Sequence, residues 1–262
     1  MFHNLWAYRQ FVLSSIRNEL VSRFARSKLG GLWMIINPLS QVAIYALILS
    51  NVLAAKLPGI EENEYGYAIY LMAGLLAWTL FSEIVGRCLT LFIEQGNLMK
   101  KMQFPRITLP AIVVGSSILN NALLFIAMLG VFLLLGHKFS WVMIWLLPLT
   151  LVLASFALGM GLVLGIVNVF VRDLGQVVLI ILQMWFWFTP IVYPEDIIPE
   201  GYRDWLNFNP VYHFTSAYQD ILVYGRIPEA GGLIAVGTST LLLLLLGLFF
   251  FRRSSEEMVD VL

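Results

Sequence analysis

Six long apolar runs, separated by short polar segments, divide this chain of 262 residues. As helices of about 20 residues or more, such runs cross roughly 30 Å of hydrocarbon. They lie at Trp33–Ala55, Ala68–Ile93, Ile107–Leu135, Trp141–Phe170, Leu174–Tyr193 and Gly231–Phe251. The pattern predicts an all-α polytopic membrane protein, with six transmembrane helices in one transmembrane domain, residues 1–262.

The first 28 residues alternate apolar and polar positions with the period of a helix. One side collects Phe2, Leu5, Leu13, Ile16, Leu20 and Phe24, and the other Ser14, Ser15, Asn18 and Ser22. We predict an amphipathic interface helix within residues 1–30, whose arginines suit anionic headgroups; an ordinary soluble helix is the alternative. Because the segment lacks the pattern of a cleaved signal peptide, we expect it to be retained.

Residues 194–229 are too polar to span a membrane, yet they are rich in aromatic side chains. Asn209 followed by Pro210 is typical of a helix N-cap and first helical position. Helical spacing then relates Val211, Phe214, Tyr218 and Ile221. The segment predicts short re-entrant or gate helices before the last span, with an extracellular loop carrying incidental aromatics as the alternative.

The positions of the charged residues along the chain are more informative than the net charge. The chain is 60% hydrophobic, 12% charged and formally neutral, which excludes an ordinary soluble domain and gives no basic footprint for nucleic acid. One set of segments holds Arg9, Arg17, Arg23, Arg26, Lys28, Lys100, Lys101, Arg106, Arg172, Arg252 and Arg253, and the other only Lys56, Lys138, Arg203 and Arg226. By the positive-inside rule, both termini are predicted to be cytoplasmic.

Motifs for catalysis and cofactor binding are missing. No lysine is followed by Ser or Thr, as a phosphate-binding loop requires, and the three histidines have no metal-ligand spacing. Cys88 is the single cysteine, so it cannot form a disulfide within the chain. We expect no catalytic residue, no metal site and no cofactor bound by this chain.

Glu83 and Arg87 are charged residues inside the second apolar run. A charge at mid-bilayer costs about 2.5–3.5 kcal/mol, and the i,i+4 spacing allows the two to pair. The pair is either part of an aqueous substrate pathway or a structural ion pair between packed helices.

A basic, proline-containing segment connects the second and third runs. Leu98, Met99 and Met102 share one side of a short predicted helix, and Pro105 ends it. Such a helix is a poor membrane anchor but suits a groove on another protein. We predict that residues 94–105 form a helix that couples this chain to a partner protein. The residues predicted to make the contact are Asn97, Leu98, Met99, Lys100, Lys101, Met102, Phe104, Pro105 and the adjacent Arg106. A loop that only orients the chain in the membrane is the alternative.

Three motifs occur in order along the chain. They are "SKLGGLWMIINPL" entering the first run, "KKMQFPRITLP" after the second and "FTPIVYP" closing the fifth. Together they resemble the permease subunits of type-2 ATP-binding-cassette exporters for O-antigen, capsule and teichoic acid. The resemblance implies a homodimer in the bacterial inner membrane, two copies of a separate ATPase subunit that binds ATP and Mg, a coupling helix at 97–103 and outer gate helices.

The function we expect is export of a lipid-linked polysaccharide through a pore at a dimer interface. Aromatic faces would contact the sugar rings, and the predicted pathway residues are Tyr45, Trp78, Glu83, Arg87, Trp185, Trp187 and Tyr193, with Phe186 and Phe188 as further candidates. The aromatics from Trp185 onward fit an interfacial belt equally well. Alternatives are a drug or lipid exporter of the same topology and an intramembrane enzyme acting on lipid-linked sugars.

Overall fold

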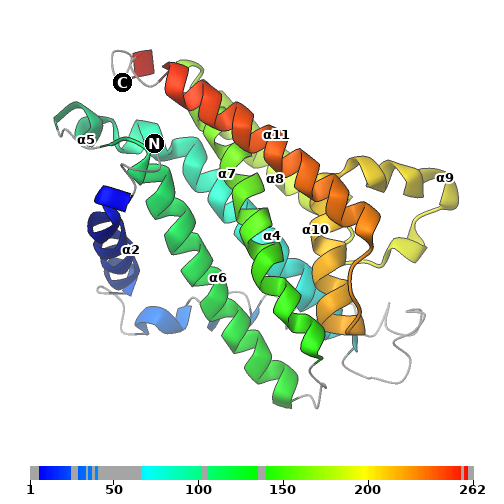
Figure 1. Ribbon diagram of the computed structural model, residues 1–262. Helices are drawn as coiled ribbons and strands as arrows, with labels where there is room; N and C mark the ends of the chain where they lie inside the picture. The colour runs from blue at the N-terminus through cyan, green and yellow to red at the C-terminus, as the bar shows by residue number, and fades with distance from the viewer. Residues whose placement is uncertain are drawn as a thin grey trace.

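The computed structural model describes residues 6–24, 29–33, 35–36, 39–40, 66–101, 105–134, 140–254 and 257–258. Every regular element in these ranges is a helix (Figure 1). The longer ones are α2 (Arg9–Phe24), α4 (Gly66–Glu94), α6 (Thr108–Leu134), α7 (Leu146–Phe170), α8 (Leu174–Phe188), α10 (Pro210–Gln219) and α11 (Ala230–Ser254). The shorter ones are η1 (Gly30–Leu32), α5 (Gly96–Lys101), η3 (Trp141–Trp145), η4 (Glu195–Ile197), α9 (Glu200–Arg203), η5 (Asp204–Phe208) and η6 (Asp220–Tyr224).

Four helices of the described residues are long and apolar enough to cross a membrane. They are α4, α6, α11 and the continuous stretch formed by η3 and α7. Their bounds confirm the predicted second, third, fourth and sixth runs as helices, with ends within a few residues. The first predicted run, Trp33–Ala55, lies largely outside the described residues, so the count of six spans stays a prediction.

The fifth run is a shorter helix than predicted. α8 ends at Phe188 instead of Tyr193, and its 15 residues extend about 22 Å, less than the hydrocarbon thickness. Pro190 disfavours the helical conformation of the residue before it, Thr189, which is extended. The chain then turns into the protein, where the Tyr67 hydroxyl donates a hydrogen bond of 2.7 Å to the carbonyl oxygen of Val192.

α4 is the most buried of the long helices, and α7 packs closely against both α4 and α11. Glycines permit the approach: a Cβ added at Gly161 would lie 2.6 Å from the Cβ of Cys88, and one added at Gly159 would lie 2.6 Å from the backbone of Leu243. Small residues at such crossings are typical of helix association in membranes.

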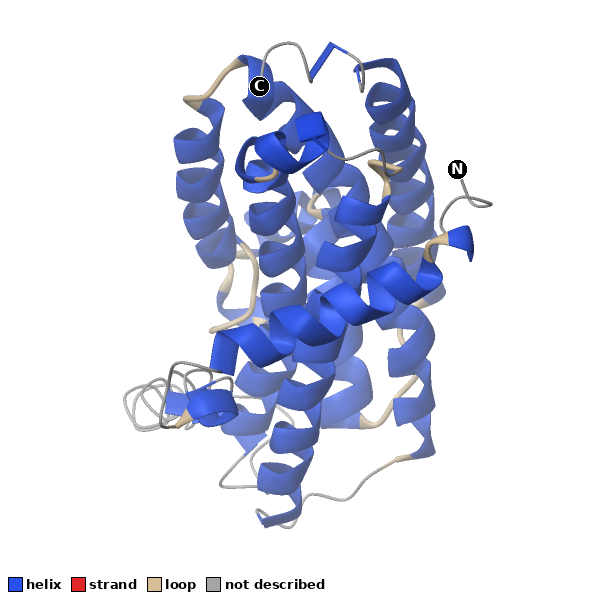
Figure 2. Cartoon of the chain, turned by 90° about the vertical axis from the view of Figure 1, so that its left-hand side faces the viewer, coloured by secondary structure: helices blue, strands red, loops and turns tan. Residues whose placement is uncertain are grey.

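α2 crosses the outside of the bundle and packs against α6 (Figure 2). Ile16 is buried there, over Gly115, where an added Cβ would collide with the Ile16 side chain. The predicted apolar face is only partly used, since Leu13 remains 64% exposed. A position at the membrane interface stays a prediction.

Short helices follow α8, as predicted for residues 194–229. The predicted N-cap is confirmed, because Asn209 Oδ1 accepts hydrogen bonds from the backbone N–H groups of Val211 (3.0 Å) and Tyr212 (3.3 Å). The periodic apolar positions of this segment are all buried: Val211, Phe214, Tyr218 and Ile221. α10 packs against α4 and α11 at the end of the bundle opposite to α5 and the last turns of α11 (Figure 1).

Candidate functional site

A groove of about 810 Å³ runs between α4 and α8. Both helices contribute aliphatic, aromatic and polar side chains to it. The lining from α4 is Leu75, Trp78, Thr79 and Ser82, and the lining from α8 is Leu179, Ile180, Leu182, Gln183, Met184, Phe186 and Trp187.

Aromatic rings form one part of the groove wall. The rings of Trp78 and Phe186 are 5.5 Å apart and edge-to-face, and those of Phe186 and Trp187 are 5.4 Å apart in the same arrangement. Trp78 is buried, whereas Trp187 is 56% exposed. Trp78 packs on Phe186, and Phe186 packs on Trp187, so the Trp187 ring is held in place while its exposed surface remains available to a ligand.

Polar groups lie beside these rings. The Ser82 hydroxyl donates to the Trp78 carbonyl at 2.8 Å, so its oxygen lone pairs remain free to accept. Gln183 is exposed and has no hydrogen-bond partner among the described residues. The groove can therefore contact an apolar ligand face through its rings and bond hydroxyl groups through Gln183 and Ser82.

The predicted aromatic residues separate into two groups. Trp78 and Trp187 line the groove, whereas Trp185 and Tyr193 do not. Trp185 donates from Nε1 to Asn209 Oδ1 at 2.9 Å, and the Tyr193 hydroxyl donates to the Trp187 carbonyl at 2.6 Å. Trp185 therefore fastens α8 to the N-cap of α10. Phe188 is 68% exposed and also outside the groove lining, and Tyr45 lies outside the described residues.

Arg87 is the centre of a polar network that joins three helices. It lies 3.5 Å from Glu83, confirming the predicted pair, and 2.5 Å from Glu19 of α2. It also donates to the hydroxyls of Ser116 (2.7 Å) and Ser117 (3.2 Å) of α6. None of these residues lines the α4–α8 groove, but Glu19 and Arg87 line a separate cavity of about 530 Å³ between α2, α4 and α6. The pair is therefore structural in its contacts, and its part in a substrate pathway stays a prediction.

Sequence reasoning missed the partners that other helices supply. Asn120 donates to Glu83 Oε2 at 2.8 Å, and Glu19 is 68 positions from Arg87. A signal was present for α6, because Ser116, Ser117, Asn120 and Asn121 place polar groups at helical spacing in an apolar run, which indicates polar partners. No pattern in the sequence indicated Glu19.

The predicted coupling segment forms the short helix α5. Asn97 and Lys100 are exposed, Leu98 is half-buried, and Met99 is only 5% exposed because it packs into the core of this chain. Met99 is therefore occupied within its own fold. Pro105 and Arg106 precede α6 and are half-buried; Met102 and Phe104 lie outside the described residues, as does the side chain of Lys101.

A protein family and several individual proteins are similar to this chain over most of its length. Residues 10–223 match the ABC-2 type transporter family. An O-antigen export system permease protein from Myxococcus xanthus is 29% identical over 244 residues, covering 92% of this chain and 91% of the relative. A second, from Klebsiella pneumoniae, is 27% identical over 87% and 85%. A polysialic acid transport protein from Escherichia coli is 27% identical over 86% and 85%.

Proposed function

Since the chain belongs to the ABC-2 type transporter family, we propose that it is the channel-forming permease subunit of an ATP-driven exporter of lipid-linked polysaccharide. It is a multi-pass membrane protein and a transport permease. Polysaccharide as cargo is supported by relatives that match over most of both chains.

The observation that carries the proposal is the groove between α4 and α8. A moving polymer requires repeated weak contacts, because one tight site would hold it in place. The Trp78, Phe186 and Trp187 rings offer flat apolar surface for sugar C–H groups, and Gln183 offers an amide for hydroxyls. No element of this arrangement fixes a single register of the polymer.

A second copy of this chain would close the groove into a channel. Most of α8 is exposed, with only Val178 and Leu182 buried, and its exposed side chains are mainly large and apolar. Two copies facing each other along α8 would place two aromatic walls around one path. We therefore propose a homodimer with the channel between the subunits.

ATP hydrolysis is assigned to a separate partner. A nucleotide-binding ATPase subunit, in two copies, would bind ATP and Mg and dock at the α5 end. Among the α5 side chains that the structure describes, Asn97 and Lys100 are the exposed ones that such a partner would contact. The surplus of Lys and Arg in the segments at this end supports the proposal that it faces the cytoplasm, with both termini, in a bacterial inner membrane.

Deletion of the gene in its host tests the proposed cargo. We expect surface polysaccharide to disappear and lipid-linked glycan to accumulate inside the cell, with both restored by the wild-type gene. Normal surface polysaccharide in the deletion strain, together with altered export of a drug or a simple lipid, would contradict the proposal.

A further inference from the structure

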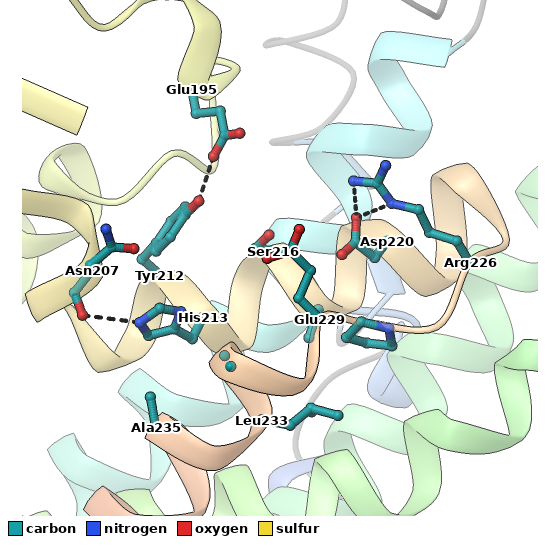
Figure 3. Close-up of a pocket in the computed structure, with 14 residues that line it drawn as sticks. Glu195, Asn207, Tyr212, His213, Ser216, Asp220, Arg226, Glu229, Leu233 and Ala235 are labelled. Carbon is teal, nitrogen blue, oxygen red and sulfur yellow. Dashed lines mark hydrogen bonds and ion pairs between the residues drawn. The ribbon is translucent and has the colours of Figure 1, made fainter. Parts of the chain in front are cut away.

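Two adjoining polar cavities lie at the α10 end of the bundle, away from the α4–α8 groove. One, of about 440 Å³, lies between α10 and the start of α11 (Figure 3), and the other, of about 390 Å³, lies between α10 and the turn after α8. They share the lining residues Glu195, Tyr212, Ser216, Asp220 and Arg226. Each has the size of a small-molecule site, and together they suit consecutive units of a chain-like ligand.

Hydrogen-bond acceptors face the larger cavity. The Asp220 side chain is only 8% exposed. Its Oδ1 accepts both hydrogen bonds from Arg226, and its Oδ2 has no partner among the described residues. The Glu229 carboxylate likewise has no hydrogen-bond partner there. His213 Nε2 lies 3.0 Å from the Asn207 carbonyl and therefore donates, so in the neutral ring Nδ1 is an acceptor.

Donors lie beside these acceptors. Arg226 uses Nε and Nη2 on Asp220, at 2.8 and 2.7 Å, so that Nη1 remains available. Gly231 and Gly232 line the cavity in the first turn of α11, where backbone N–H groups have no partner within the helix. A ligand in this cavity therefore meets donors and acceptors within one small volume.

The charges discriminate among ligands. The lining holds three carboxylates, Glu195, Asp220 and Glu229, and one guanidinium, Arg226, so an anion would be repelled on balance. A metal ion is equally unsuited, because no group of three or more His, Cys, Asp or Glu in the described part of the chain could hold one. Sugar hydroxyls both donate and accept, which matches the mixed lining, and the Tyr212 ring supplies an apolar surface.

We propose that these cavities form a binding site for an uncharged oligosaccharide, a contact point for the glycan outside the α4–α8 groove. The inference rests on the proposed export function, and it narrows the cargo to neutral glycans. An anionic polymer such as polysialic acid would place its carboxylates against Glu195, Asp220 and Glu229.

Binding to the full-length chain in nanodiscs, without an ATPase, tests the site. Mannotriose serves as the neutral probe, an α2,8-linked sialic acid trimer as the anionic probe, and dissociation constants come from saturation-transfer NMR titrations. Gly232→Leu fills the cavity: a Cβ there lies 3.4 Å from His213 Nδ1, an ordinary contact. Gly237→Leu is the matched control, since it lies on the same helix in open space and outside the cavity lining.

The site predicts that mannotriose binds the wild type and Gly237→Leu alike, and Gly232→Leu at least about tenfold more weakly. Glu229→Gln, which keeps the shape but loses the charged acceptor, should weaken binding by about tenfold and decides the matter if Gly232→Leu does not fold. Equal affinities of wild type, Gly232→Leu and Glu229→Gln would overturn the site. So would stronger binding of the sialic acid trimer, or of inorganic phosphate or calcium, than of mannotriose.

The two levels of the proposal can fail separately. If mannotriose does not bind but the deletion strain loses its surface polysaccharide, the site is wrong and the export function stands. If mannotriose binds as described but surface polysaccharide is unaffected by the deletion, the site remains and the export function is wrong.

Discussion

Arg87 of α4 lies 2.5 Å from Glu19 of α2, and through this contact the N-terminal helix is tied to the most buried span. Both side chains are about one-quarter exposed. The same guanidinium also contacts Glu83 and two serines of α6, so one cation holds together three helices.

Removing Arg87 should therefore cost more than removing either carboxylate. Arg87→Met removes the cation that contacts both Glu19 and Glu83, and we expect a loss of about 2–4 kcal/mol, less than for a fully buried pair because the site is partly exposed. Glu19→Gln and Glu83→Gln each keep the cation paired and should cost about 1 kcal/mol. Thermal unfolding in detergent compares them; equal losses for all three variants would contradict the network.

Docking on the ATPase should depend on the exposed residues of α5 and not on Met99. Lys100→Asp should leave the melting temperature unchanged and reduce co-purification with the ATPase several-fold, because it inverts an exposed charge. Met99→Asp should instead lower the melting temperature, since the carboxylate would be buried in the chain's own core. An unchanged yield of ATPase with Lys100→Asp would place the contact elsewhere.

The two neighbouring tryptophans of α8 should behave differently. Trp187→Ala should reduce export about fivefold without affecting stability, because an exposed stacking surface is lost. Trp185→Ala should lower the melting temperature, because the indole no longer donates to the α10 N-cap. Trp141, which is 94% exposed and outside the groove lining, provides the alanine control. A stable, fully active Trp187→Ala protein would remove the groove wall from the pathway.

Asp220 gives the protein a pH dependence of known sign. Burial raises its carboxyl pKa above the ordinary 3.8, with Glu229 and Glu195 adding to the rise and Arg226 opposing it. Between the ordinary pKa of the unfolded chain and the raised pKa of the folded protein, the folded state keeps a proton that the unfolded state has lost. The contribution of Asp220 to stability therefore falls as the pH rises from the first of these pKa values through the second.

Asp220→Asn should remove this contribution. At about pH 7 the variant should be at least as stable as the wild type, by up to a few degrees in melting temperature, and the difference should shrink toward about pH 4. Melting curves of both proteins across this range measure the difference. A variant that is less stable than the wild type at pH 7, with a difference that closes as the pH falls, would contradict the assignment, because that is the signature of a lowered carboxyl pKa.

The sequence predicted elements where a local pattern determines the structure. Asn209 and Pro210 specified the start of α10, and the spacing of Val211, Phe214, Tyr218 and Ile221 identified its buried face. The apolar runs located α4, α6, α7 and α11 because length and hydropathy alone decide whether a helix can span. Candidate chemistry that depends on local spacing, such as the Glu83–Arg87 pair, was also predictable.

Contacts between distant segments could not be read from the chain. Four consecutive aromatics, Trp185 to Phe188, cover most of a helix circumference, so their pattern could not tell the groove-facing Trp187 from Trp185, which bonds Asn209. The local pattern put Met99 on a docking face with Leu98, whereas the structure buries it. This burial results from packing against distant parts of the fold, which the local pattern does not show. The cavities around Asp220 combine residues from the turn after α8, α10 and α11, which no single pattern links.

ATP-driven movement of a glycan across a membrane tests the central claim most directly. The chain and its proposed ATPase partner, identified in the host by co-purification, would be reconstituted into liposomes with a fluorescent lipid-linked neutral glycan. A membrane-impermeant quencher would report which side the glycan occupies. We predict that ATP moves the glycan to the side opposite the ATPase, and that Trp187→Ala slows this movement while Trp141→Ala does not. A complex that hydrolyses ATP but leaves the glycan where it was would contradict the account.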